Sequence, residues 1–224
     1  MPSLNSRKSF YFVRPPRVVR WMYAGALWRV PGPEPRIYLT FDDGPDPEVT
    51  PRILDLLEQW QARATFFVIG EQAIRHPGLV REILSRGHGL GSHGMTHLNG
   101  RKTSLADYLA DVGLAQIQLK TEFDVEWRGF RPPYGKVTPH QWAALKSNFE
   151  VVFWDLMPGD FDPKTTPQKC LQRLMDLSRP GSIVVLHDSK GSWDKLREIL
   201  PEYLESFSRN NWKFEALPGS VALG

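Results

Sequence analysis

Cysteine is nearly absent from this sequence, since Cys170 is the only one among 224 residues. A single cysteine cannot form an internal disulfide, which excludes the class of small secreted scaffolds stapled by disulfides. No stretch reaches the roughly 18 consecutive apolar residues of a membrane-spanning helix. The first residues also lack the apolar run and the small-residue cleavage site of a secretory signal, which predicts a cytoplasmic protein.

Internal repeats, low-complexity tracts and interdomain linkers are likewise missing. The composition, with 41% hydrophobic and 24% charged residues, is that of an ordinary globular chain. A chain of this length buries roughly 70% of the surface that its unfolded form exposes, which is enough for one sizeable core. We therefore predict a single domain, and we expect a monomer.

Positive charge is concentrated near the amino terminus. Residues 1–36 carry seven basic side chains against one acidic side chain, a net charge of +6, whereas the rest of the chain carries −3. Residues 1–35 form a basic arm in which arginines alternate with apolar residues between Arg14 and Arg29, a mixture that would suit a helix lying on an anionic membrane. Packing of the aromatic residues onto the fold is the alternative. The arm contains no base-reading module, so nucleic acid is not an expected partner.

Short β-branched and aromatic runs alternate with segments of helical periodicity along the rest of the chain. Strongly apolar strands in this alternation predict an α/β fold, a parallel sheet covered by helices, with about seven strand–helix units. Such units close into a barrel or spread into an open sheet, and periodicity does not separate the two. The predicted strands cover 36–41, 64–70, 129–131, 151–154, 182–186 and 212–214.

Two predicted helices begin at recognisable capping signals. Thr50 precedes Pro51, which predicts an N-cap followed by proline at the first helical position. The helix that runs to Phe123 would be capped by Thr103 or Ser104.

The polar residues that interrupt these patterns come directly after strands. In barrels and open α/β sheets alike, sites are built at the carboxyl ends of the strands. Five clusters are therefore expected to meet at one end of the fold: Asp42 with Asp43, His93 with His97, Arg131 to Gly135, Asp155 with Asp160, and His187 with Asp188.

Two of these clusters suggest a metal site. His93 and His97 are four residues apart, which places two imidazoles on one side of a helical turn, although this spacing alone is a weak signal. Asp42 and Asp43 strengthen it, because the Gly-Pro-Asp-Pro that follows already supplies the turn chemistry. Two adjacent carboxylates at a buried strand end repel each other unless each has its own counterpart. We expect one beside the metal and the other beside Arg131.

In their order along the chain, these clusters resemble the five motifs of the polysaccharide deacetylases, carbohydrate esterase family 4 with its NodB homology domain. The resemblance runs from about residue 36 to residue 217, and five ordered motifs are specific where any single one is weak. The residues that carry it are Thr40-Phe41-Asp42-Asp43-Gly44-Pro45, His93-Gly94-Met95-Thr96-His97, Arg131-Pro132-Pro133-Tyr134-Gly135, the segment from Trp154 to Asp160, and Leu186-His187-Asp188, with Ala64 to Gly70 similar to the family's second strand.

The resemblance implies a distorted (β/α)7 barrel, with a catalytic domain over residues 36–218 and a short tail at 219–224. It also implies removal of acetyl groups from N-acetylated sugars with a divalent metal, usually Zn2+, with Co2+ or Ni2+ as alternatives. By the match of motifs, the implied metal ligands are Asp43, His93 and His97. Asp42 resembles the general base, and Arg131 resembles the residue that orients this base. His187 resembles the general acid, and Asp160 resembles the carboxylate that tunes this acid, with Arg63 as a candidate partner of Asp160; the backbone N–H of Tyr134 resembles the donor to the oxyanion.

Two positions depart from the family pattern. Gly94 follows the first ligand histidine where the family usually has Ser or Thr, so a hydrogen bond that supports the metal loop is expected to be missing. Phe161 stands where the family often has Trp, which would alter the wall of the acetyl pocket.

Several functional alternatives stay open at the level of sequence. The acetylated sugar could belong to a polymer, an oligomer or a lipid-linked glycan, and the last would place the basic arm at the inner face of a membrane. A metal-containing carbohydrate-binding protein without turnover is one rival, and a related barrel hydrolase that acts on a non-sugar amide is another. The presence of Asp42 and His187 beside the ligand residues favours catalysis over binding alone.

Overall fold

The computed structural model of the protein describes residues 11–221. Arg7 and Lys8 of the predicted basic arm, and the last three residues of the predicted tail, therefore lie outside the described residues. The division of the chain at residues 35 and 218 stays a prediction.

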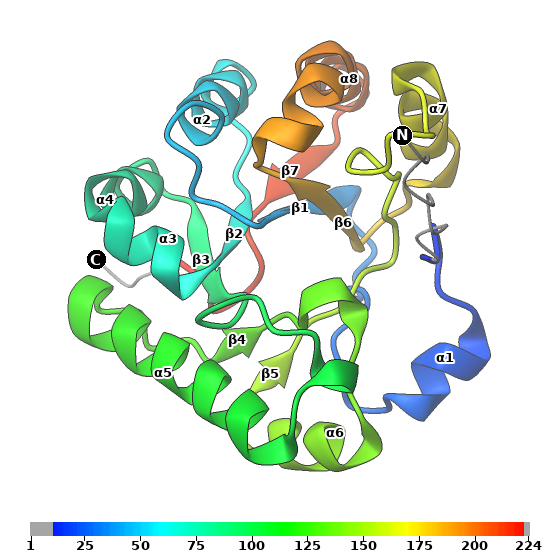
Figure 1. The fold of residues 1–224 in the computed structure, drawn as a ribbon. Coiled ribbons are helices and arrows are strands. Elements are labelled where there is room, and N and C mark those ends of the chain that lie inside the picture. Colours follow the sequence, from blue (N-terminus) through cyan, green and yellow to red (C-terminus); the bar gives the residue numbers. More distant parts are fainter. Residues whose placement is uncertain (1–10, 222–224) are drawn as a thin grey trace, which may run out of the picture.

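In the described part of the chain, seven parallel strands form the centre of the fold, and helices surround them (Figure 1). The strand order is β5-β4-β3-β2-β1-β6, and β7 pairs with β1. This arrangement confirms the predicted single-domain α/β fold and its distorted (β/α)7 barrel. The strands are β1 (Arg36–Asp42), β2 (Thr65–Val68), β3 (Gly89–Ser92), β4 (Gly129–Phe130), β5 (Glu150–Val151), β6 (Ser182–His187) and β7 (Lys213–Glu215).

The helices mostly occupy the connections between successive strands, as right-handed crossovers require. Before β1 lies α1 (Arg17–Met22). The others are α2 (Thr50–Gln59), α3 (Gly70–Arg75), α4 (Pro77–Ser85), α5 (Leu105–Phe123), α6 (Pro139–Leu145), α7 (Pro167–Leu177) and α8 (Lys190–Arg209), with short 3-10 turns η1 (Gly100–Lys102) and η2 (Pro133–Gly135).

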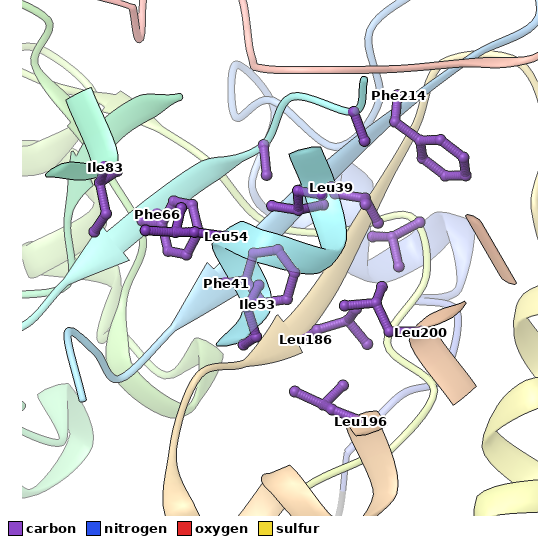
Figure 2. Packing of buried hydrophobic residues seen from close by; sticks show 14 of the residues in the cluster. Leu39, Phe41, Ile53, Leu54, Phe66, Ile83, Leu186, Leu196, Leu200 and Phe214 are labelled. Carbon is purple, nitrogen blue, oxygen red and sulfur yellow. The ribbon is translucent and has the colours of Figure 1, made fainter. Parts of the chain in front are cut away.

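The main hydrophobic core lies between the central strands and the helices that cover them. Side chains of β1, β2 and β6 meet those of α2 and α8, and the rings of Phe41 and Phe66 stack with centroids 5.1 Å apart (Figure 2). Because both faces of a parallel strand are covered, its sequence reads as a continuous apolar run. This explains why β1 and β6 could be predicted from sequence.

The amino-terminal segment completes the barrel between β5 and β6. Leu27 forms a parallel bridge with Val152, and Arg29 forms an antiparallel bridge with Ser182. Gly181 has a φ of +78°, and a Cβ at this position would overlap the carbonyl oxygen of Val30. The segment before β1 is thus built into the barrel wall.

The arm does not form one continuous helix over residues 14–29, as a helix lying on a membrane would require. Only α1 forms there, while Tyr23 and Trp28 pack against the barrel, as in the packing alternative. Val18 and Trp21 of α1 are exposed, so contact of the arm with an anionic membrane stays a prediction. Among the described residues, no helix is both long enough and apolar enough to cross a bilayer.

The two predicted helix caps have different outcomes. Ser104 caps α5, because its side chain accepts a hydrogen bond from the N–H of Asp107. The prediction for Thr50 is wrong by one residue, since α2 begins at Thr50 itself and the cap position is Val49. The Thr50 hydroxyl instead donates to Asp188 at 2.6 Å and ties the start of α2 to the end of β6.

Asp155 fastens the amino-terminal segment to the barrel. Its carboxylate is fully buried and accepts hydrogen bonds from Arg14, Arg20, Arg179 and Ser182 at 2.6–3.1 Å. Burial acts to raise the pKa of Asp155, but the hydrogen bonds from Arg179, Arg20 and Ser182 outweigh it and lower the pKa to about 2. Asp155 is therefore a structural anion that neutralises basic residues of the arm.

We predict that Asp155→Asn lowers the free energy of unfolding by about 2 kcal/mol, because three partly exposed arginines lose their buried counter-charge. Urea denaturation measures this loss, and trypsin should cleave the variant faster near residues 14–29. Glu34→Gln is the matched control, since it removes an exposed carboxylate paired with Arg36 and should change stability by less than about 0.5 kcal/mol. Equal stability of the two variants would contradict the anchoring role.

Candidate active site

A cavity of about 180 Å3 lies at the carboxyl ends of the strands. Asp155 was expected at this end but does not reach it, since its carboxylate accepts a hydrogen bond from Ser182 at the amino end of β6. The residues to which a metal-binding or catalytic role was assigned do come together at the cavity, because each lies at or beyond the carboxyl end of a strand. All but Asp160 line the cavity, and Asp160 contacts one that does. The lining residues are Tyr11, Asp42, Asp43, His93, His97, Arg131, Pro132, Tyr134, Gly135, Lys136, Trp154, Met157, Phe161 and His187.

Asp43, His93 and His97 form a cluster that could hold a metal ion. Their ligand atoms all lie within 4.8 Å of one another, with Asp43 Oδ1 3.6 Å from His93 Nε2 and 3.3 Å from His97 Nε2. Two ligands bound at about 2.0–2.1 Å to a tetrahedral Zn2+ lie about 3.3 Å apart, which matches the two separations that involve Asp43, and the two imidazoles would draw together around such an ion. Two imidazoles and one carboxylate also leave a coordination position open.

The first histidine is held in the protonation state that a metal ligand needs. His93 Nδ1 lies 2.8 Å from the carbonyl oxygen of Arg131, which can only accept, so the proton is on Nδ1 and the Nε2 lone pair faces Asp43. Burial lowers the pKa of His93 to about 4, which keeps the ring neutral at pH 7.

The third member of the cluster, Asp43, is ionised. Burial acts to raise the pKa of Asp43, but the hydrogen bond from His97 and the positive charge of His187 outweigh burial and hold the pKa below its ordinary value. A carboxylate anion beside two histidines is a suitable donor set for a divalent cation.

The loop between the two histidines is supported by Asp111 of α5. This buried carboxylate accepts the backbone N–H groups of Met95 and Thr96 at 2.8 and 2.9 Å, and the Thr96 hydroxyl at 2.6 Å. Gly94 has a φ of +82°, and a Cβ there would approach the Asp111 carboxylate to 2.8 Å. Glycine thus leaves room for Asp111, which gives the loop a hydrogen-bonded support that we did not predict.

Asp42 and Arg131 form a buried ion pair beside the cluster. Arg131 Nη1 donates to Asp42 Oδ1 at 2.6 Å and to Thr40 Oγ1 at 2.7 Å. Asp42 Oδ2 lies 4.0 Å from His93 Nε2, so the second carboxylate oxygen faces the cavity. The two adjacent aspartates therefore have separate counterparts, as the repulsion between them requires.

Asp160 binds the Nδ1 atom of His187, which leaves the other ring nitrogen, Nε2, for the chemistry in the cavity. Its carboxylate lies 3.1 Å from His187 Nδ1 and accepts the His187 backbone N–H at 2.8 Å. Burial alone would lower the pKa of His187, but the charge of Asp160 and its hydrogen bond raise it to about 9. His187 is therefore protonated at pH 7, with Nε2 free to donate.

The expected pairing of Arg63 with Asp160 is wrong. Arg63 precedes β2 and its backbone N–H donates to Phe214, at the amino end of the barrel, whereas Asp160 binds His187 beyond the carboxyl end of β6. The side chain of Arg63 lies close to Gly87 instead.

Backbone strain gathers at this site. Asp43, His97 and Tyr134 have φ values of 80°, 60° and 60°, in the left-handed region that residues with a Cβ rarely adopt. Each such residue costs of order 1 kcal/mol or more and persists only where its surroundings fix it, which is characteristic of functional sites.

Sequence reasoning missed the contribution of the arm to the cavity. Tyr11 lines it, and the Tyr11 ring packs edge-to-face on Phe161, which in turn packs on His187. Trp154 forms another wall and donates its Nε1–H to the carbonyl of Phe12. The aromatic run at residues 10–12 was the available signal, but no spacing rule connects it with Phe161.

The fold and the site together define a (β/α) barrel protein with a candidate metal centre. A family profile for polysaccharide deacetylase matches residues 29–149. The chain is 32% identical over 189 residues to a peptidoglycan-N-acetylglucosamine deacetylase of Bacillus cereus, a match that covers 84% of this chain and 88% of the relative. The chain belongs to the polysaccharide deacetylase family, which confirms the resemblance found in its motifs.

Further comparisons agree with this family. A chitooligosaccharide deacetylase of Bradyrhizobium is 35% identical over 154 residues, covering 68% of this chain and 70% of that relative. A solved peptidoglycan N-acetylglucosamine deacetylase structure superimposes with a TM-score of 0.78 at 30% identity, covering 90% of this chain and 95% of that chain. A pseudoenzyme of carbohydrate esterase family 4 from Bacillus anthracis has a TM-score of 0.75 at 21% identity over 87% of this chain and 68% of that one, which shows a shared fold alone.

We predict that Asp111→Asn weakens Zn2+ binding by about 10- to 100-fold, because the backbone of the loop before His97 loses a charged acceptor. Competition with a fluorescent chelator measures the affinity. Glu122→Gln, an exposed acid-to-amide change on the same helix, is the control and should bind Zn2+ like the wild type. Unchanged affinity in Asp111→Asn, with the fold intact by circular dichroism, would contradict this support.

Proposed function

We propose that the protein is a metal-dependent deacetylase that hydrolyses the acetamide of N-acetylglucosamine units in a glycan. The observation that carries this proposal is the placement of two separately paired groups, Asp42 on Arg131 and His187 on Asp160, beside the Asp43–His93–His97 cluster. Relatives named as deacetylases of peptidoglycan and chitooligosaccharides support the substrate class.

An amide is a poor electrophile, and a divalent cation is the group proposed to activate it here. We assign it to Asp43, His93 and His97 and propose Zn2+, with Co2+ or Ni2+ as alternatives suited to the same nitrogen and oxygen donors. When bound, such a cation polarises the acetamide carbonyl and lowers the pKa of a water molecule toward about 7.

Asp42 acts as the general base in this proposal. Arg131 holds Oδ1, so the carboxylate cannot rotate freely and Oδ2 stays directed at the cavity. Oδ2 accepts the proton of the attacking water, while the hydrogen bond from Arg131 to Oδ1 keeps the carboxyl group in position. Positioned acid–base groups of this kind contribute about 10²- to 10⁴-fold in rate.

His187 acts as the general acid. Because Asp160 occupies Nδ1, the proton on Nε2 is the one that can be donated to the departing amine, which is a poor leaving group until protonated. The ring of Phe161 packs on His187 and limits access of water to it. The N–H of Tyr134, at the cavity wall, is the proposed donor to the oxyanion.

A binding protein without turnover is the second candidate, because the fold alone is shared with a pseudoenzyme. The intact Asp42–Arg131 and His187–Asp160 pairs favour catalysis over binding alone. A barrel hydrolase acting on a non-sugar amide would use the same pairs. A cytoplasmic position at the inner membrane and a monomeric state stay predictions.

We predict that His93→Ala and His97→Ala lose bound metal and activity together, whereas Asp42→Asn and His187→Ala retain the metal and lose at least about 10²-fold in kcat. Acetate release from N-acetylglucosamine oligomers and metal content of each purified variant measure the two effects. Wild-type release should stop with a chelator and return with Zn2+.

Metal-free Asp42→Asn would overturn the assigned roles. Release unaffected by Asp42→Asn would overturn the proposed catalytic site, and turnover of a non-sugar amide without acetate release would favour the other hydrolase.

The pH profile provides an independent check. Asp160 raises the pKa of His187, so kcat/KM should fall as pH rises through about 9, where the acid loses its proton. In Asp160→Asn the protonated form of His187 loses its counter-charge, which lowers the pKa of His187. The upper limb of the profile, where kcat/KM falls with rising pH, should therefore move by at least one pH unit toward neutrality. Asp194→Asn, an exposed change on α8, should leave the limb in place. A limb unmoved in Asp160→Asn would exclude His187 as the titrating acid.

A further inference from the structure

A second cavity adjoins the catalytic one. Its volume is about 230 Å3, larger than the apolar cavity of about 150 Å3 that accommodates a benzene ring. Tyr11, Tyr134, Gly135, Lys136 and Trp154 line both cavities, so the two cavities are immediate neighbours. We call it the apolar groove, and its lining residues are Tyr11, Phe12, Pro15, Val19, Met22, Tyr23, Trp28, Arg101, Tyr134, Gly135, Lys136, Phe153 and Trp154.

The outer wall of the apolar groove comes from the arm. Val19 and Met22 of α1 line it, and Met22 is 59% exposed, so the groove is open to solvent on this side. The aromatic rings inside are engaged with one another: Trp28 stacks on Phe153 with centroids 4.5 Å apart, and Tyr23 packs on Phe153 at 5.3 Å. These contacts place the rings of Tyr23, Trp28 and Phe153 side by side and form a continuous aromatic wall.

Charge in the apolar groove has one sign. Of the residues that the structure describes, no carboxylate lines it, while Arg101 and Lys136 do. Within residues 11–221 neither cation forms a salt bridge, and Lys136 lies 6.0 Å from the ring of Tyr134 at the boundary between the cavities. Unpaired cations beside an apolar wall are complementary to a ligand that joins an anion to a hydrocarbon chain.

We propose that the apolar groove binds the hydrocarbon chain of an amphiphilic substrate, in which an N-acetylated sugar is linked to the chain through a phosphate. This proposal rests on the deacetylase function proposed above, because it places the sugar in the catalytic cavity. The phosphate lies between the two cavities, where Lys136 and Arg101 pair with it. The hydrocarbon chain of the substrate covers the side chains of Met22 and Val19 and is removed from water there.

The test compares two soluble substrates that differ only in the hydrocarbon: the octyl and the methyl phosphodiester of N-acetylglucosamine 1-phosphate. Each buried methylene contributes about fourfold, so a groove that covers even two of them gives at least tenfold. We expect kcat/KM for acetate release to be at least tenfold higher for the octyl compound, mainly through a lower KM. Neutral octyl N-acetylglucosaminide, without the phosphate, should lie below the octyl phosphodiester.

Two variants on α1 form a matched pair, since Met22 and Val18 are 59% and 61% exposed but only Met22 lines the groove. Met22→Asp should remove the preference for the octyl substrate and leave turnover of the methyl substrate unchanged. Val18→Asp should leave both unchanged. Arg101→Ala should weaken the preference for the phosphodiester over the neutral octyl glycoside.

Equal kcat/KM for the octyl and methyl phosphodiesters would overturn the proposal and leave the deacetylase function standing. Absence of acetate release from these compounds and from chitooligosaccharides alike would instead overturn the proposed function. In that case calorimetric titration with the deacetylated octyl and methyl phosphodiesters decides the groove independently of turnover. Tighter binding of the octyl compound, lost in Met22→Asp but kept in Val18→Asp, would support the groove, and equal or no binding would refute it.

Discussion

The ion pair between Asp42 and Arg131 is the contact on which the rest of the site depends. Arg131 is fully buried, and its guanidinium bonds to β1 through Thr40 and Asp42 and to the carbonyl oxygens of Val152 and Phe153 beyond β5. Its own carbonyl accepts from His93. A buried cation left without these acceptors would cost several kcal/mol, so the strands must align before the site is complete.

The site also illustrates how several carboxylates share a small volume. Asp42 is neutralised by Arg131, Asp160 by His187, and Asp43 lies beside the candidate ligand histidines. Each anion therefore has its own counterpart, and each pair is assigned a different chemical task. Asp42 and Asp43 both stand at the end of β1, but their partners follow β4 and β3, so the division of roles depends on the order of strands around the barrel.

Sequence reasoning reached the features that local patterns encode. Buried strands such as β1 and β6 are mostly apolar, and polar residues at their carboxyl ends marked the site. It did not reach contacts between distant segments: Leu27 and Arg29 in the barrel wall, Tyr11 in the cavity, and Asp111 under the loop. An acidic residue on a helix, such as Asp111, is expected to face solvent unless the position of the loop that covers it is known. Arg63 was misplaced because the order of motifs does not say at which end of a strand a neighbouring residue lies.

The bridges of the amino-terminal segment have a consequence for biosynthesis. Residues 27–30 leave the ribosome early, yet they pair with Val152 and with Gly181 and Ser182, which are made far later. Such contacts between distant parts of a chain delay folding, because a long loop must close before they form. Residues 27–30 must therefore wait until the chain has been synthesised as far as Ser182, and until then the apolar side chains of this segment are available to chaperones.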